Sequence, residues 1–215
     1  MPRGAADAGG PSRGDRKRAV ILEAAQQAFL ANGYLGTSMD QVAAAAAVSK
    51  QTVYKHFSDK ETLFREVVTN VMQVRDGGIP VDVLSQGDGS IEERLRTFCR
   101  NFLKGVMQPD VLKLRRLVIG EAGRFPELGR VFYELGPKRA TEQLAVAIRQ
   151  AADRRNLSVE NPDVAAEHLL SLILSRPLDQ AMLLGPEIHF TDASLDRFAD
   201  DGVTAFVRAY GLPKR

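Results

Sequence analysis

The chain has 215 residues, 44% of them hydrophobic and 26% charged, and a formal net charge of +2 at pH 7. This composition is ordinary for a soluble globular protein of one large or two small domains, with enough apolar residues for a core. A single cysteine, Cys99, excludes an internal disulfide, and no apolar run approaches the roughly 18 residues that span a membrane. No signal peptide opens the chain, so we expect a cytoplasmic protein without a membrane partner. Cys99 fits a small core residue, because nothing nearby suggests a catalytic base.

Positive charge is concentrated near the N-terminus, where residues 1–60 hold eight Lys and Arg against five Asp and Glu. Residues 1–14 are rich in Gly, Ala, Pro and Arg without periodicity, which predicts a disordered arm. The cations that follow either reach into a DNA groove or form the solvated start of a helix: Arg13, Arg16, Lys17 and Arg18. An apolar stripe from Ile21 to Phe29 then predicts a helix that stops at Asn32-Gly33.

Three helix starts follow in quick succession. Ser38 with Gln41, and Ser58 with Glu61, each match a capping box, in which the hydroxyl accepts a backbone amide and the longer side chain bonds back. Ser49 lies between them and can cap a short helix of its own. The pattern predicts two short helices joined by a tight turn, followed by a longer helix.

The second short helix has a buried and an exposed side. Val53 and Phe57 lie one turn apart and share a face, so the remaining side chains point outward or lie at the flanks. The outward surface is therefore cationic, amide-bearing and aromatic, and it comprises Lys50, Gln51, Thr52, Tyr54 and Lys55. A tight turn before such a helix is typical of a helix-turn-helix.

The string Val48-Ser49-x-x-Thr52-x-Tyr54-x-His56-Phe57, followed by Lys60 and Leu63-Phe64, resembles the DNA-binding signature of TetR-type transcriptional regulators. The resemblance extends roughly from Arg16 to Val71. One departure is Ala47, where the turn often carries glycine. A left-handed backbone there would cost alanine about 1 kcal/mol relative to glycine, which a packed domain tolerates.

The resemblance implies which side chains contact DNA. Phosphate contacts are implied for Thr37, Ser38, Tyr54, His56 and Lys60, and the free amides at helix N-termini suit phosphate oxygens independently. Base contacts are then expected from Lys50, Gln51, Thr52 and Lys55. Lysine suits guanine, glutamine suits adenine, and the threonine methyl suits thymine. His56 lies near the buried border, so a packed core role stays open for it.

The rest of the chain also has helical spacing, and nothing alternates with period two for long enough to predict a strand. We expect a connector helix that begins at Lys60 and ends before Gly77, a loop over 76–89, a capped helix starting at Ser90, and a bent region over 110–124. Pro137 and Pro162 are each expected to start a helix. The predicted fold is all-α, with a helix-turn-helix domain over 15–60 and a C-terminal bundle over 61–215 for effector binding and dimerisation.

Two apolar helices bear on association. The segment 164–174 is apolar around its circumference, and the last helix, from Leu195 to Tyr210, has a wide apolar side. Such helices can form a four-helix interface in a homodimer, or they can be the core of a larger bundle. The tracts LVIGEAGRFPELGRVFYELGP and NPDVAAEHLLSLILSRP resemble the effector domain of an AefR-like subgroup.

Few residues suggest other chemistry. His168 and His189 have no partner at metal-ligand spacing, and no phosphate-binding loop or nucleophile motif occurs, so we expect no metal, no cofactor and no enzyme. A set of charged residues either lines a pocket or forms a solvated ion-paired face: Arg115, Arg116, Glu121 and Arg124.

The sequence therefore predicts a homodimeric repressor that binds a pseudo-palindromic double-stranded DNA operator and is released by a small hydrophobic effector. Its two recognition helices would lie about 34–36 Å apart. The resemblance implies that effector bound in the C-terminal bundle pivots the connector helix and changes that spacing. A transcriptional activator of the same fold remains open, as does a ligand-binding or sequestering protein without a specific operator.

Overall fold

The computed structural model describes residues 12–76, 84, 89–185 and 187–212. The described residues are helical apart from turns and a single β-bridge between Leu157 and Gly211, so the predicted all-α class is confirmed. The chain forms two compact units, an N-terminal unit of residues 1–70 and a C-terminal unit of residues 71–215. The units meet within a helix, whereas the sequence predicted their boundary at the start of that helix, at residue 60. No helix of the described residues is long and apolar enough to cross a membrane.

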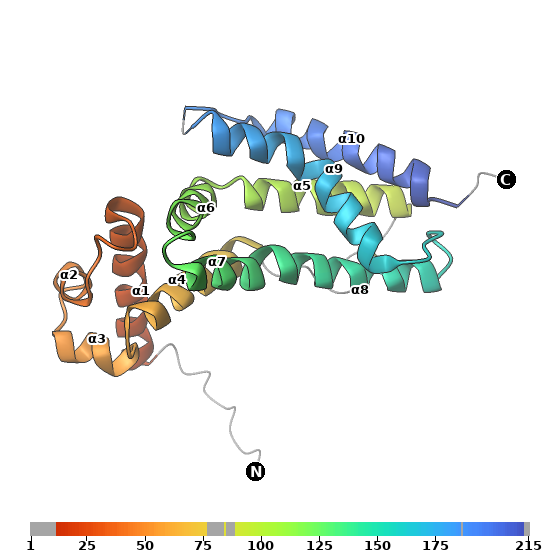
Figure 1. Cartoon of the computed structure of the whole chain (residues 1–215). Coiled ribbons are helices and arrows are strands. Elements are labelled where there is room, and N and C mark those ends of the chain that lie inside the picture. The colour runs from red at the N-terminus through yellow and green to blue at the C-terminus, as the bar shows by residue number, and fades with distance from the viewer. Residues whose placement is uncertain (1–11, 77–83, 85–88, 186, 213–215) are drawn as a thin grey trace, which may run out of the picture. The chain divides into compact units, whose positions relative to one another are not determined.

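The N-terminal unit, whose helices are seen in Figure 1, has an aromatic cluster in its core. The ring of Phe64 meets the rings of Phe29 and Tyr34 edge-on, with centroids 5.3 and 5.5 Å apart. Offset and edge-on aromatic contacts of this kind stabilise a small core beyond the area that they bury. The helices of this unit are α1 (Arg13–Asn32), α2 (Met39–Ala45), α3 (Lys50–His56) and the first part of α4 (Lys60–Asp76).

Hydrogen bonds at the helix starts confirm two of the predicted caps in this unit. Ser38 and Gln41 form the reciprocal capping box, with Gln41 N donating to Ser38 Oγ at 3.2 Å and Ser38 N donating to Gln41 Oε1 at 2.7 Å. Ser49 Oγ accepts from Thr52 N at 3.1 Å and starts α3. These side chains satisfy amides that a helix end leaves without partners.

Two other predicted boundaries were wrong. Asp59, not Ser58, caps α4, because its carboxylate accepts from Thr62 N at 2.7 Å and a negative charge is favourable at a helix N-terminus. Helix α1 begins within the arm predicted over 1–14, because Ser12 and Asp15 form a capping box that starts the helix at Arg13. Residues 1–11 lie outside the described residues, as does nearly all of the loop predicted over 76–89.

The C-terminal unit is a helical bundle in which α5, α9 and α10 lie side by side and α8 packs on α9 (Figure 1). Its core includes Leu95, Leu144, Ile173 and Phe206, none of which is exposed. The helices are α5 (Ile91–Val106), α6 (Pro109–Glu121), α7 (Pro126–Tyr133), the π-helix η1 (Glu134–Lys138), α8 (Arg139–Asp153), α9 (Pro162–Leu183) and α10 (Asp192–Tyr210).

Pro137 does not start a helix. It lies inside η1, which joins α7 and α8 into one continuous helical run. Proline has no N–H to donate and its ring crowds the carbonyl of the preceding turn, so it disrupts regular α-helical bonding. A wider π-turn accommodates this residue, and such turns are frequent next to functional sites.

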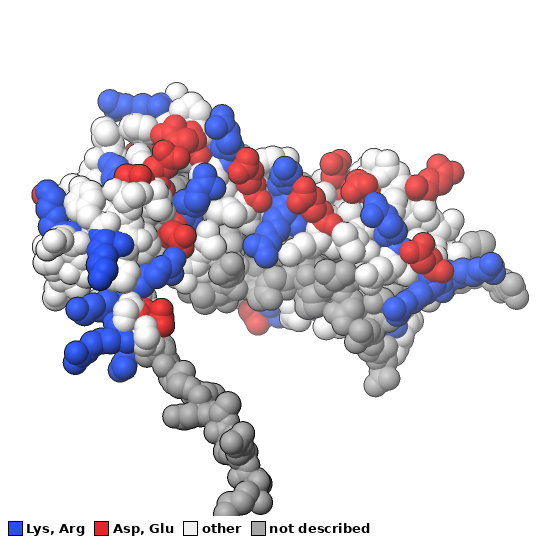
Figure 2. All heavy atoms as spheres, turned by 90° about the horizontal axis from the view of Figure 1, so that it is seen from below, with Lys and Arg blue, Asp and Glu red and all other residues white. Residues whose placement is uncertain are grey.

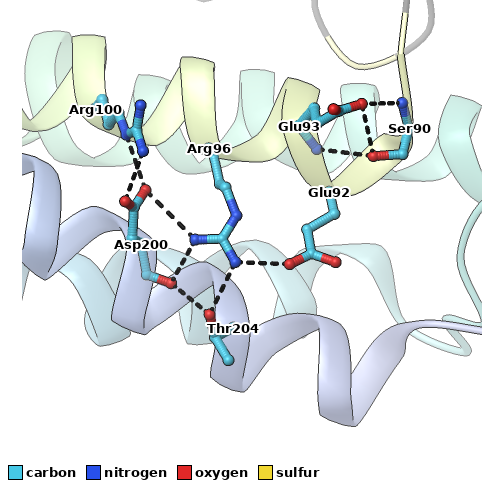
Figure 3. Close-up of polar contacts among 7 residues, drawn as sticks. All are labelled: Ser90, Glu92, Glu93, Arg96, Arg100, Asp200 and Thr204. Atoms are coloured by element: carbon cyan, nitrogen blue, oxygen red, sulfur yellow. Dashed lines mark hydrogen bonds and ion pairs between the residues drawn. The ribbon is translucent and has the colours of Figure 1, made fainter.

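Charged side chains connect α5 to α10 (Figure 3). Arg100 donates to both carboxylate oxygens of Asp200, from Nε at 2.8 Å and from Nη2 at 2.6 Å. Arg96 lies 3.5 Å from the same carboxylate and also donates to Thr204 Oγ1 and Glu92. The two arginines lower the pKa of Asp200, chiefly through the hydrogen bonds from Arg100. The paired geometry fixes the register of the two helices.

Candidate functional site

The outer face of α3 is open to solvent. Val53 and Phe57 are buried behind it, with exposures of 0% and 1%. The outward side chains of Lys50, Gln51, Tyr54 and Lys55 are exposed, and Thr52 and His56 are half-buried at its edges. The face therefore presents hydrogen-bonding groups from a helix that is fixed from behind, as major-groove recognition requires.

The turn that places α3 has a left-handed residue. Ala47 has a φ of +51°, and the backbone amides of Ala47 and Val48 donate to the carbonyls of Ala44 and Ala43, both at 3.1 Å. This pair of bonds is a Schellman motif, which ends α2 and satisfies its last carbonyls. The motif usually carries glycine at this position, and the alanine adopts the same conformation.

Two contacts orient the start of α3. Lys50 Nζ forms an ion pair with Asp40 of α2, 2.8 Å from Oδ1, and this pairing raises the pKa of Lys50. The Oγ of Ser49 and the Oγ1 of Thr52 lie 2.8 Å apart. Asp40 was not among the predicted site residues, because no spacing rule connects residues ten apart across a turn. Both members of the ion pair are mostly exposed, so the pair is weak and DNA can compete for Lys50.

Thr37 and Lys60 are placed differently from the implied phosphate contacts. Thr37 is 2% exposed, and its hydroxyl donates to the carbonyls of Gly33 and Ala28 at 2.9 and 3.1 Å. The Nζ of Lys60 donates to the carbonyls of Tyr34 and Thr37 at 2.9 and 3.0 Å, and lies 4.4 Å from the centre of the Tyr34 ring. Both polar groups thus hold the connection between α1 and α2, and their implied phosphate contacts stay a prediction.

Of the other three implied phosphate residues, Tyr54 is exposed on α3 itself, and Ser38 and His56 flank its outer face. Ser38 is exposed, but its hydroxyl is engaged in the capping box of α2. His56 lies beside Phe57 with ring centroids 6.3 Å apart. Its half-buried position leaves both a surface contact and a packing role available.

Further cations surround the start of α1. Arg13, Arg16 and Lys17 border a shallow hollow of about 400 Å³ together with Val20 and Val48. Figure 2 shows Lys and Arg side chains gathered on the N-terminal unit, whereas both signs of charge are interspersed over the rest of the visible surface. Clustered cations of this kind attract the phosphate backbone.

Arg18, the fourth of these predicted cations, has its own partners within the N-terminal unit. It pairs with Glu66, and its guanidinium carbon lies 5.5 Å from the centre of the Phe57 ring. Its guanidinium thus connects α1 to α4 and lies over a buried ring of the helix-turn-helix. We therefore assign Arg18 a packing role, and the predicted contact with a DNA groove then applies to Arg13, Arg16 and Lys17.

The C-terminal unit contains a cavity of about 440 Å³, within the range of small-molecule sites. Its wall comes from the end of α4 and from α5, α6, α8 and α9, and the π-helix contributes Gly136 and Pro137. Of the predicted pocket residues, Arg115 lines the cavity, while Arg116, Glu121 and Arg124 do not. The apolar part of the wall includes Met72, Phe102, Val106, Ala140, Leu170 and Leu174.

Other reactive groups are used structurally. Cys99 is fully buried, and burial raises the pKa of its thiol, which disfavours the reactive thiolate. The Nδ1 of His168 and the hydroxyl of Tyr210 lie 2.7 Å apart, which joins α9 to α10. Within the described ranges, no cluster of three His, Cys, Asp or Glu residues is arranged to hold a metal.

Two family models match the chain. The model for bacterial regulatory proteins of the tetR family matches residues 21–67, which contain the helix-turn-helix. The model for the C-terminal domain of AefR-like transcriptional repressors matches residues 93–212, more than half of the chain. Both resemblances predicted from the sequence are therefore confirmed.

Whole-chain relatives agree with these matches. A structure from Mesorhizobium loti MAFF303099, assigned to the TetR family of transcriptional regulators, is 39% identical with a TM-score of 0.83, covering 94% of this chain and 100% of the other. The flavonoid-responsive regulator FrrA is 34% identical with a TM-score of 0.76, covering 93% and 99%. YezE of Bacillus subtilis (strain 168), an uncharacterized HTH-type transcriptional regulator, is 24% identical over 185 residues, which are 85% of this chain and 90% of YezE.

Proposed function

The chain belongs to the TetR family of bacterial transcriptional regulators, and we propose from this premise that it is a homodimeric repressor released from a pseudo-palindromic operator by a small apolar effector. The observation that carries the proposal is the open polar face of α3, fixed from behind by Val53 and Phe57. A regulator that binds the bacterial chromosome works in the cytoplasm, where we place it.

We assign the base contacts to the outward side chains of α3, namely Lys50, Gln51, Thr52 and Lys55. Tyr54, His56 and the amides at the Ser38 cap flank this face and are assigned to phosphates. The cations at the start of α1 add sequence-independent attraction. Thr37 and Lys60 instead hold the unit that carries α3, because their polar groups already bond to backbone carbonyls.

Dimerisation is proposed through α9 and α10. Val164 and Leu172 on α9 are 39% and 45% exposed, and Leu183 at its end is 81% exposed. Apolar side chains repeated along one helix favour burial against a second copy, and a two-fold pair would present two α3 helices to successive major grooves about 34–36 Å apart. Sedimentation of Leu172→Glu should show a monomer where the unaltered chain sediments as a dimer.

The effector is assigned to the cavity of the C-terminal unit. Its wall is mainly apolar, and FrrA, which shares about a third of its residues with this chain, is described as responsive to flavonoids, which are aromatic molecules. A hundred-fold loss of operator affinity requires only about 2.7 kcal/mol of preference for the released state. An apolar ligand in a cavity of this size can supply that difference.

The operator can be identified by sequencing the genomic DNA fragments that the purified protein binds. Anisotropy titrations against this operator and its single-base variants then test α3. Gln51→Ala and Lys55→Ala should each reduce discrimination by about 1–3 kcal/mol at one position. Gln27→Ala and Lys113→Ala remove the same side-chain types from exposed positions on α1 and α6 and should leave binding unchanged.

If Gln51→Ala and Lys55→Ala lost the same affinity for every operator variant, the assignment of Gln51 and Lys55 to base contacts would be wrong. Binding to DNA should weaken steeply with added salt, because phosphate contacts release counterions. A chain that retains no specific fragment but binds small molecules tightly would instead be a sequestering protein. A retained operator whose occupancy raises transcription would identify an activator.

A further inference from the structure

The cavity of the C-terminal unit has one half-buried cation among its described wall residues. Arg115 on α6 is half-buried, and its Nε is enclosed without a hydrogen-bond partner. Its guanidinium carbon lies 5.1 Å from the centre of the Phe132 ring, and no ion pair forms to it within the described part of the chain. Burial lowers the pKa of Arg115, since no carboxylate offsets the loss of solvent.

Three other arginines of this bundle hydrogen-bond within the protein, although the Nε of Arg116 is enclosed without a partner, like that of Arg115. Arg96 and Arg100 both pair with Asp200 (Figure 3), and Arg116, the neighbour of Arg115, donates from Nη2 to the carbonyl of Ala181 at 2.7 Å. A buried cation without an anion is unfavourable, and evolution usually supplies one. Arg115 therefore differs from these three in having no hydrogen bond or ion pair to the described residues where it borders an apolar cavity.

We propose that the cavity binds an amphiphilic anion, whose apolar body fills the apolar wall and whose acidic group pairs with Arg115. This proposal rests on the assignment of the effector to this cavity and adds the chemical class of the ligand. A guanidinium suits carboxylate, sulfonate or phenolate oxygens, because its planar N–H groups form short, charge-assisted bonds. Medium-chain fatty acids and aromatic acids both have this chemistry.

A second ionisable group borders the same cavity. Glu167 on α9 is exposed, and no ion pair joins it to Arg115. Its carboxylate is solvated, so its field is screened more strongly than that of the half-buried Arg115. The two charges together therefore favour an anionic ligand in the cavity. The charge of the preferred ligand can be measured directly.

Two fluorescent probes isolate the charge. 8-Anilinonaphthalene-1-sulfonate (ANS) and N-phenyl-1-naphthylamine (NPN) share an aromatic body, and only ANS has a sulfonate. In titrations of the full-length chain, Arg115→Met should raise the Kd of ANS at least ten-fold and change the Kd of NPN less than two-fold. Lys113→Met removes an exposed cation from the same helix and should change neither value.

Displacement of NPN tests the sign of the preferred ligand. Dodecanoate should displace it at a lower concentration than dodecyltrimethylammonium, and Glu167→Gln should leave this order unchanged. The reverse order would overturn the proposal in favour of a cationic ligand held by Glu167. If Arg115→Met does not fold, the same ANS and NPN titrations are made with Arg115→Gln, which keeps a polar side chain without the charge.

The outcomes separate the two levels of the proposal. If neither probe saturates at one site per chain, the assignment of the effector to this cavity fails. If both probes bind at one site but Arg115→Met weakens them equally or not at all, the cavity is a ligand site and the anion proposal is wrong. A selective loss of ANS and dodecanoate supports both.

Discussion

Two residues other than glycine have a left-handed backbone in the described part of the chain, Ala47 and Arg155, with φ of +51° and +56°. Each follows the end of a helix in a Schellman motif, since Asn156 N and Arg155 N donate to the carbonyls of Ala151 and Ala152 at 2.9 and 2.8 Å. Glycine is the usual residue at this position. We expect Ala47→Gly to stabilise the N-terminal unit.

The size of the effect follows from two opposing terms. The left-handed conformation costs an L-residue about 1–2 kcal/mol, which glycine avoids. Glycine in turn loses about 0.5–1 kcal/mol more conformational free energy on folding than alanine does. The methyl group of Ala47 is exposed, so its removal leaves no cavity. The expected net gain is about 0.5–1 kcal/mol.

Amide hydrogen exchange of α2 and α3 measures this gain in the unit itself, without requiring both units to unfold together. Ala47→Gly should slow the exchange of these amides about 2–5-fold. Ala44→Gly places the same substitution at an exposed position inside α2 and should accelerate exchange by a similar factor, because glycine is unfavourable within a helix. Equal acceleration by both variants would refute a left-handed residue 47.

Three further substitutions test the packing described above. Gly202→Ala should lower the free energy of unfolding by about 1–3 kcal/mol in urea titrations, because a Cβ at this position would lie 2.6 Å from Ile173 Cγ2. Gly120 has open space around it, so Gly120→Ala should not lower the free energy of unfolding by a comparable amount. Asp200→Asn should cost about 1–2 kcal/mol at pH 7. Since its pKa is lowered by folding, this stabilisation is complete above about pH 4 and is lost as the pH falls through the folded value, so the variant should lose less stability on acidification. Lys60→Met should lower stability by about 1–3 kcal/mol, measured by urea unfolding, and leave the salt dependence of operator binding unchanged.

The helix-turn-helix could be predicted because its determinants are local. The Ser38–Gln41 box and the Ser49 cap join residues three apart, so the spacing alone identifies them. The buried positions of Val53 and Phe57 likewise follow from the helical period. At the start of α4 the spacing of Ser58 and Glu61 predicted the wrong cap, because the carboxylate of the neighbouring Asp59 forms it instead.

Tertiary contacts account for what the sequence could not show. Lys60 and Thr37 look like surface polar residues by type, but backbone carbonyls from the loop after α1 accept their hydrogen bonds. The pairing of Lys50 with Asp40 depends on the angle between α2 and α3, which no spacing rule supplies. Arg115 was predicted only as one of several charged residues, because burial without a partner is a property of the packed bundle.

The π-turn at Pro137 has a consequence for how this region tolerates change. A π-turn holds one residue more than an α-turn, so the helix after it keeps its direction while the apolar positions shift by one along the sequence. Deleting a single residue between Glu134 and Lys138 would turn the π-turn into an α-turn and keep the apolar side of α8 against α9. The same deletion in the middle of α8 would rotate everything after it by about 100°. The loss of one residue is thus tolerated better at this point of the chain than within the α-helices on either side.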